Sequence, residues 1–206
     1  MKIGLFGGSF DPIHIGHLMV AEQMLYELQL DKILFIPAQI NPFKTQTPPI
    51  KAKHRVKMTQ LAIQNNSQFL LNTLEIKSPP PSYTIDTLLK LKETYPSHTQ
   101  FFLLAGSDIL ENFKNWKEWK KIIQNTKIAI FLREHHHNAK ELQQQYPFII
   151  LPHSFLIPFS SSQIRSWIAQ KKPFRYTLPP KVYDYIQKNK LYQIANSDDG
   201  LSYHKI

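Results

Sequence analysis

Short apolar runs that alternate with stretches of helical periodicity constrain the fold of this chain more than any other feature. The runs have the length and character of buried strands and cover 2–6, 32–36, 69–76, 101–105, 128–132 and 148–151. Elsewhere apolar residues recur at helical spacing, which predicts helices over 18–28, 54–64, 85–95, 160–170 and 179–189. Buried strands that alternate with helices are typical of a parallel sheet covered on both faces. We therefore expect an α/β fold that binds its ligand at the carboxyl ends of the strands.

The domain organisation is simple. The chain has 206 residues, enough to bury a core, and it contains no internal repeat and no long linker. We expect a single domain over 1–192 and a frayed tail over 193–206, where the sequence is polar and without pattern.

Composition excludes several classes of protein. The chain has no cysteine, which rules out disulfide scaffolds, thiolate zinc sites, iron–sulfur clusters and cysteine nucleophiles, and favours a reducing compartment. No apolar run approaches the roughly 18–20 residues of a membrane span, and the run before Gly7 is too short for a signal peptide. We expect a cytoplasmic protein that does not bind membranes.

The formal charge of +10 points to an anionic partner. All but four of the 25 cationic residues are lysines, and they are scattered along the chain. Scattered lysines argue against a nucleic-acid-binding arm, so we expect no specific nucleic acid and favour a phosphorylated small molecule. The sequence leaves open whether the chain forms a homo-oligomer.

Glycine is concentrated in one place. Four of the six glycines lie in the first sixteen residues, and two of them open the segment GGSFDPIHIGH, from Gly7 to His17. This segment joins the first predicted strand to the first predicted helix. We expect its glycines to let the chain turn sharply out of the strand, so that backbone N–H groups and the helix N-terminus face one point. Such an arrangement is an anion site.

Two histidines belong to the same segment. His14 and His17 are three residues apart, so at a helix start they can share a face and donate hydrogen bonds to phosphate oxygens. An isolated H-x-x-H is more often a turn with incidental histidines, and a zinc pair is disfavoured because the H-E-x-x-H spacing and cysteines are missing. The combination of strand, glycines, histidines and helix favours a phosphate site. We predict no metal site made by protein ligands alone.

Three further patterns have structural alternatives. Ser160, Ser161 and Ser162 could simply cap a helix, but Arg165 one turn later suits a nucleotide phosphate. The run His135, His136 and His137 fits an exposed polar loop better than a metal site, and its role stays open, as does that of the tail. We interpret His54 and Arg55 as structural, and Thr84 first of all as a helix cap.

The quoted motifs resemble a known family. GGSFDPIHIGH resembles the H-x-G-H signature of the nucleotidyltransferase superfamily, whose members join a nucleoside triphosphate to a phosphorylated acceptor and release pyrophosphate. With SYTIDTL at 82–88, AGSD at 105–108 and SSSQIR at 160–165, the pattern is similar to bacterial nicotinate-nucleotide adenylyltransferases. The match runs from Lys2 to about Tyr192, nearly the whole chain.

This resemblance implies a fold, a reaction and partners. The fold is a Rossmann-like, doubly wound parallel sheet with a small helical C-terminal part. The reaction joins ATP and nicotinate mononucleotide to give nicotinate adenine dinucleotide and pyrophosphate, a step of NAD biosynthesis. Mg²⁺ is expected with ATP, because the triphosphate requires it and no carboxylate cluster is visible in the sequence.

The resemblance also implies roles for individual residues. Charge on the phosphates and on the departing pyrophosphate is expected to be stabilised by His14, His17, Arg165 and Lys44. ATP is expected to be bound by Gly7, Gly8, Ser9, Phe10, Gly106, Asp108, Ser161, Ser162 and Ile164. The nicotinate nucleotide is expected to be bound by Tyr83, Thr84 and Trp116. Lys44 could equally be a solvated lysine, and the alternative for Trp116, close to Trp119, is packing in the core.

Two departures from the family pattern affect only the adenine and pyridine pockets. Phe159 precedes the serines where relatives usually have an aliphatic residue, and Lys117 follows Trp116 where a tyrosine is common. Two alternatives remain at this point. One is pantetheine-phosphate adenylyltransferase of the same superfamily, which is usually shorter and typically has threonine where this chain has His14. The other is a basic nucleic-acid-binding protein without catalysis.

Overall fold

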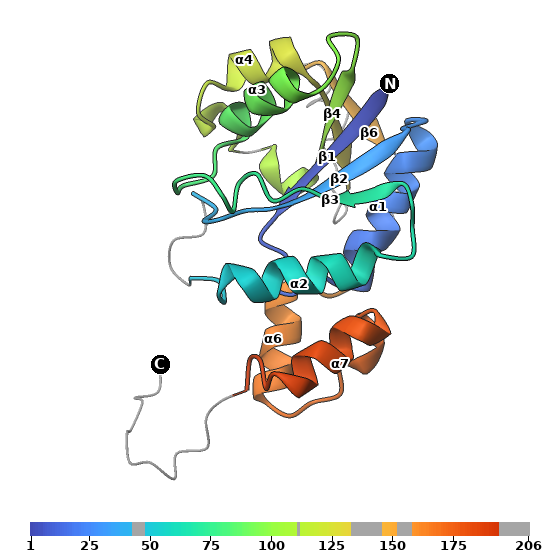
Figure 1. The fold of residues 1–206 in the computed structure, drawn as a ribbon, viewed down its shortest axis with the longest axis vertical. Coiled ribbons are helices and arrows are strands. Elements are labelled where there is room, and N and C mark those ends of the chain that lie inside the picture. Colours follow the sequence, from blue (N-terminus) through green and yellow to red (C-terminus); the bar gives the residue numbers. More distant parts are fainter. Residues whose placement is uncertain (43–47, 111, 133–145, 152–157, 194–206) are drawn as a thin grey trace.

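The computed structural model describes residues 1–42, 48–110, 112–132, 146–151 and 158–193. Within these ranges six strands form one parallel sheet in the order β3-β2-β1-β4-β5-β6 (Figure 1). The strands are β1 (Lys2–Gly8), β2 (Lys32–Pro37), β3 (Phe69–Leu71), β4 (Gln100–Gly106), β5 (Lys127–Phe131) and β6 (Phe148–Leu151). This is the strand order of the doubly wound Rossmann fold, so the predicted fold class is confirmed.

Helices cover both faces of the sheet. On one face, α1 (Ile15–Glu27) and α2 (Ala52–Ile63) pack against side chains such as Phe6 and Phe35. On the other face lie α3 (Thr84–Thr94) and α4 (Trp119–Asn125), against Leu5, Leu103 and their neighbours. Short 3₁₀ turns η1 (Ser107–Ile109) and η2 (Phe113–Asn115) follow β4. The alternating direction of side chains along each strand thus supplies a core to both layers.

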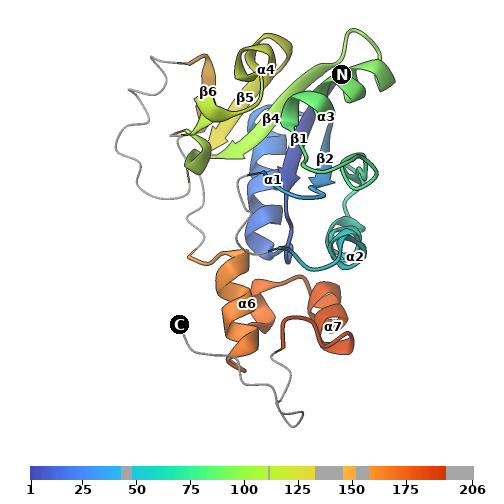
Figure 2. The ribbon, with the colours of Figure 1, turned by 90° about the vertical axis from the view of Figure 1, so that its left-hand side faces the viewer.

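The C-terminal helices lie beyond the carboxyl ends of the central strands. Here α6 (Ser161–Ala169) and α7 (Pro180–Lys188), with the 3₁₀ turn η3 (Arg175–Thr177) between them, sit below the sheet in both views (Figure 2). Helix α7 is joined to α2 by a hydrogen bond of 2.9 Å between the hydroxyl of Tyr185 and Nδ1 of His54. This pair agrees with the structural role expected for His54.

Two local predictions are wrong. The strand predicted over 69–76 ends at Leu71, because the side chain of Asn72 accepts a hydrogen bond of 2.9 Å from the backbone N–H of Leu74 and turns the chain. Thr84 is not the cap of its helix. Tyr83 occupies the N-cap position and Thr84 is the first helical residue, with no side-chain capping bond at this end.

The remaining expectations concern the tail and the membrane. Of the predicted tail 193–206 the structure describes only Gln193, which is exposed, so the frayed tail and the single-domain boundary stay predictions. Among the described residues, no helix has the length and apolar character needed to cross a membrane.

Candidate active site

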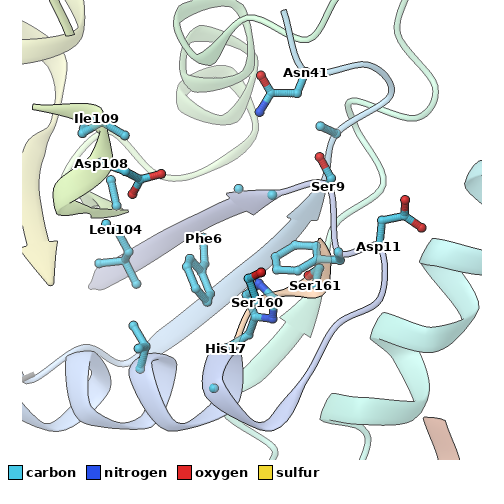
Figure 3. Close-up of a pocket in the computed structure, with 18 of the residues that line it drawn as sticks. Phe6, Ser9, Asp11, His17, Asn41, Leu104, Asp108, Ile109, Ser160 and Ser161 are labelled. Atoms are coloured by element: carbon cyan, nitrogen blue, oxygen red, sulfur yellow. The ribbon is translucent and has the colours of Figure 1, made fainter. Parts of the chain in front are cut away.

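A cavity of about 1090 Å³ opens at the carboxyl edge of the sheet. Its walls include Gly7 and Gly8 at the end of β1 and Ala105 and Gly106 at the end of β4. From β1 the chain winds outward in one direction and from β4 in the other, so these two strand ends form the switch point where such sheets bind ligands. Figure 3 shows side chains of β1, α1, η1 and α6 gathered around this space.

The glycines of the first segment act differently from the prediction. None of the described glycines has a positive φ, and Gly7 and Gly8 still belong to β1, so the expectation that they make the turn is wrong. The left-handed residue is Phe10, with φ of 47°. A Cβ atom on Gly7 would meet nothing within 4 Å, and one on Gly8 would approach the Phe10 ring to 3.2 Å. The missing side chains therefore leave room for a ligand and for Phe10.

Phe10 supports the cavity from the core. It is 2% exposed, and its ring makes edge contacts with Phe6 and His17 at centroid distances of 5.9 and 5.3 Å. Aromatic pairs in this geometry are favourable and restrict the rings to one orientation. Phe10 therefore holds the imidazole of His17 in place, which is compatible with the predicted role of Phe10 in shaping the cradle.

The structure brings His14 and His17 together at the start of α1. His14 is the N-cap residue, and the two ring centroids are 3.7 Å apart. The backbone N–H of His14 donates to Nδ1 of His17 over 3.1 Å. Because Nδ1 accepts, the proton of a neutral His17 ring is on Nε2, which makes this nitrogen a donor. Both residues line the cavity, as their spacing predicted.

The three serines each have a distinct contact. Ser160 is the N-cap of α6, and its hydroxyl accepts from the backbone N–H of Gln163 over 3.2 Å. The hydroxyl of Ser161 donates to the carbonyl of Pro12 over 2.8 Å, and that of Ser162 lies 3.1 Å from Nη2 of Arg165. The motif thus caps a helix and also fastens that helix to the loop after β1.

Arg165 of α6 also contacts the loop after β1. Its Nη1 donates to the carbonyl of Asp11 over 2.7 Å, and the side chain remains partly exposed at the cavity. Ile164 differs from its neighbours because it does not line the cavity: its side chain is fully buried in the core beside α7. Ile164 therefore anchors α6, and a contact of its side chain with the nucleotide has no support in this arrangement.

A buried arginine that the sequence interpretation treated as structural fixes the cradle. Arg55 of α2 is 1% exposed and donates to the carbonyls of Ser9, Ile50 and Gln39 over 2.8, 3.1 and 3.1 Å. Burial lowers the pKa of its guanidinium, and the negative charge of Asp11 opposes that shift. The sequence gives no signal for these contacts, because two of the three acceptors are 46 and 16 residues away.

Another part of the cavity wall is formed by the predicted nicotinate residues. Tyr83 and Thr84 stand at the start of α3, whose first N–H groups have no acceptor within the helix. Trp116 follows η2 and packs on Phe113 with ring centroids 5.5 Å apart. Trp116 and Trp119 are both partly buried against the same core cluster, but only Trp116 lines the cavity.

Lys117, a departure from the family pattern, also lines the cavity. Its ammonium group pairs with the carboxylate of Asp86 at 2.8 Å and lies 4.7 Å from the centroid of the Tyr83 ring. These contacts hold a cation beside the start of α3, where Asp86 belongs to the first turn. The negative charge of Asp86 is thereby offset on the cavity side of the helix.

Glu75 is a cavity residue that the sequence analysis missed. Its Oε1 accepts a hydrogen bond of 2.8 Å from the hydroxyl of Thr87, and Ser82 supplies a second one. Burial raises the pKa of this carboxyl, and the two hydrogen bonds oppose the shift. Glu75 lies in the stretch predicted as the end of a strand, and no motif there singles it out as a site residue.

Acidic residues do not form a metal cage in the described part of the chain. Asp11, Glu75 and Asp108 line the cavity, but no three His, Asp or Glu side chains there are grouped to hold a metal ion. Lys44 and the run His135, His136 and His137 lie outside the described residues.

The remaining predicted nucleotide-binding residues lie where expected. Ser9 follows β1, and Asp108 is in η1 after β4; both line the cavity and are labelled in Figure 3. Of the predicted site residues that the structure describes, all except Ile164 line the same cavity.

Comparison with known proteins identifies the family. A model of the cytidylyltransferase-like family matches residues 5–166. The chain is 38% identical over 194 residues to a protein of Bacillus licheniformis described as a probable nicotinate-nucleotide adenylyltransferase, covering 93% of this chain and 98% of that one. It is also 38% identical to the nicotinate-nucleotide adenylyltransferase of Bacillus subtilis, with the same coverage of both chains.

A solved structure gives the same result. The Plasmodium falciparum nicotinic acid mononucleotide adenylyltransferase complexed with NaAD superposes with a TM-score of 0.78 at 27% identity, covering 93% of this chain and 97% of that one. The strand order, the cavity at the switch point and these similarities agree. The chain belongs to the nicotinate-nucleotide adenylyltransferases of the cytidylyltransferase-like family.

Proposed function

We propose that this cavity transfers the adenylyl group of ATP to nicotinate mononucleotide, giving nicotinate adenine dinucleotide and pyrophosphate. The observation that carries the proposal is that one cavity is lined by the two histidines, by the serine motif with Arg165, and by the start of α3 with Trp116. The first two groups suit a polyphosphate. The third suits an aromatic ring that carries an anionic substituent.

The chemistry requires positioning and charge stabilisation rather than a protein nucleophile. A phosphate oxygen of the acceptor attacks the α-phosphorus of ATP, the bond from that phosphorus to the oxygen bridging the α- and β-phosphates breaks, and pyrophosphate leaves with the electron pair. The attacking phosphate is largely ionised at neutral pH, so no protein base is needed. Catalysis then depends on alignment and on donors aimed at the charge that develops.

His14 and His17 are proposed as those donors. The contact between the His14 N–H and Nδ1 of His17 fixes the tautomer of His17, and Phe10 fixes its ring, so the Nε2 proton is oriented before the substrate binds. Preorganisation of this kind is the main source of electrostatic catalysis. The space left by Gly7 lets the phosphates approach the strand end.

Arg165 is proposed to hold the departing pyrophosphate. The contacts to Asp11 and Ser162 use only two of the five N–H groups of its guanidinium and fix its plane beside the N-terminus of α6. A planar fork in a fixed orientation suits the β- and γ-phosphates. Lys44 stays a prediction for the same role, and Asp108 and Gly106 for the adenosine side.

The nicotinate side is proposed to use the start of α3. Backbone N–H groups at a helix N-terminus favour an anion, and the ammonium group of Lys117 offsets the negative charge of Asp86 in the first turn. Trp116, supported by Phe113, offers a ring face for stacking on pyridine.

Mg²⁺ is proposed to enter with ATP. When bound it neutralises charge on the phosphates, and Asp108 at the cavity wall could contact its waters. His14, His17 and Arg165 are proposed to supply the protein contacts to the phosphates.

The test of this function is an acceptor panel. Pyrophosphate release from ATP is measured with nicotinate mononucleotide, with pantetheine phosphate and with no acceptor. Release that depends on nicotinate mononucleotide supports the proposal. Release with pantetheine phosphate alone would indicate a pantetheine-phosphate adenylyltransferase. If neither acceptor increases the release of pyrophosphate, the proposed adenylyl transfer is wrong.

A further inference from the structure

Tyr192, near the C-terminal end of the described residues, forms a hydrogen bond with Asp11, which lines the cavity. The hydroxyl of Tyr192, which follows α7, donates to Oδ1 of Asp11 over 2.7 Å. The two residues are 181 positions apart, and Asp11 lies in the loop directly after β1. The contact therefore joins the end of the helical C-terminal part to the ligand-binding loop of the sheet.

The partner of Tyr192 is a buried carboxylate with two cations nearby. Asp11 is 7% exposed, and its Oδ2 lies 3.9 Å from Nη1 of Arg165. Its charge also acts on the buried guanidinium of Arg55. Nη1 of Arg165 instead donates to the backbone carbonyl of Asp11 over 2.7 Å. The carboxylate of Asp11 is thus close to Arg165 without forming a short charged hydrogen bond with it.

We propose that Tyr192 is a positioning residue for the reaction: its hydroxyl holds the Asp11 carboxylate away from Arg165, so that the guanidinium keeps its charge for the pyrophosphate. A movement of about 1 Å would bring Oδ2 of Asp11 to the usual length of a charged hydrogen bond with Nη1. A carboxylate paired in that way competes directly with a phosphate oxygen for the same donor. The hydrogen bond from Tyr192 to the other oxygen opposes that movement.

The protonation state of Tyr192 supports this role. Burial, together with the charge of Asp11 and the hydrogen bond to it, raises the pKa of the tyrosine above its usual value. The hydroxyl therefore stays protonated at neutral pH and remains a donor to Asp11.

The inference rests on the proposed role of Arg165, so the experiment includes that residue. Binding of inorganic pyrophosphate in the presence of Mg²⁺ is measured by titration calorimetry, and the KM of ATP by turnover with nicotinate mononucleotide. The variants are Tyr192→Phe, Asp11→Asn, the double variant Asp11→Asn with Tyr192→Phe, and Arg165→Ala. Tyr176→Phe is the control, because Tyr176 belongs to the same C-terminal part and is 89% exposed.

Tyr192→Phe is expected to weaken pyrophosphate binding and raise the KM of ATP, each by about tenfold, the effect of losing one charged hydrogen bond. Asp11→Asn removes the competing charge, so it should bind pyrophosphate at least as tightly as the wild type. The double variant should recover most of the affinity lost in Tyr192→Phe, a non-additive result that a purely structural role for the hydroxyl would not produce. Tyr176→Phe should behave as the wild type.

The outcomes separate the two proposals. If Arg165→Ala weakens pyrophosphate binding and Tyr192→Phe does not, the inference about Tyr192 is wrong and the role of Arg165 stands. If Arg165→Ala has no effect, both are wrong. A double variant as weak as Tyr192→Phe would also overturn the inference. Should Tyr192→Phe fail to fold, Asp11→Asn decides alone, because weaker pyrophosphate binding in that variant contradicts the proposed competition.

Discussion

At the scale of single residues, the most informative feature is that His17 is oriented by contacts on two sides. The backbone N–H of His14 fixes the tautomer, and the ring of Phe10 fixes the plane. Neither contact needs a bound nucleotide, so the donor is in position before the reaction begins. The left-handed conformation of Phe10 belongs to the same arrangement, because it places that ring against Gly8.

His17→Ala is therefore expected to fold normally and to lose about 10²- to 10³-fold in kcat, the usual cost of removing one preorganised donor. Steady-state turnover and a thermal unfolding curve measure the two properties. His98→Ala is the matched control, since His98 is exposed and does not line the cavity. A His17→Ala variant that keeps more than about a tenth of the wild-type kcat would remove His17 from the mechanism.

At the scale of elements, the carboxyl of Glu75 links the turns after β3 to α3 through Thr87. Its raised pKa means that the folded chain binds this proton more tightly than the unfolded chain. Stability contributed by the neutral form is thus complete below the usual value of 4.5 and falls as the pH rises above it.

Glu75→Gln should remove this dependence. The difference in melting temperature, wild type minus Glu75→Gln, is expected to decrease progressively as the pH is raised from about 4 to 7. Thermal unfolding of both proteins across that range measures the difference. A difference that is constant with pH would show that the carboxyl titrates alike in the folded and unfolded chains.

Features that depend on interactions between residues close in the sequence could be predicted, and features that depend on contacts between distant residues could not. The strands and helices were predicted because apolar spacing is a local property of the sequence, and the pairing of His14 with His17 follows from the same helical spacing. The predicted end of β3 is wrong because a short polar contact made by Asn72 turns the chain after Leu71. The predicted cap of α3 is wrong by one residue, because the helix begins at Thr84 without any side-chain capping bond. The contacts of Arg55 with Ser9 and of Tyr192 with Asp11 could not be predicted, since they join residues 46 and 181 positions apart.

At the scale of the whole molecule, parallel strands bring distant motifs to one edge. The switch point between β1 and β4 brings residues of the segment 6–17, the start of α3 and the start of α6 together around one cavity. The C-terminal part forms one wall of that cavity through the start of α6. Hydrogen bonds from Ser161 and Arg165 join it to the loop after β1.

The net charge of +10 also acts at this scale. It is expected to give only weak binding to nucleic acid that decreases steeply with salt, because scattered lysines neutralise phosphates without contacting bases. Titration of duplexes of different sequence at low and at physiological salt checks this expectation. Tight, sequence-selective binding at physiological salt would favour the alternative of a nucleic-acid-binding protein.

The measurement that tests the central claim most directly is the ratio of kcat/KM for nicotinate mononucleotide and for its amide counterpart, with ATP saturating. The two acceptors differ only in a carboxylate replaced by a carboxamide. If the N–H groups at the start of α3 face that group, the carboxylate accepts charge-assisted hydrogen bonds from them that the amide cannot match. The account predicts a preference for the acid of about 10²-fold or more. Equal use of the two acceptors would contradict it.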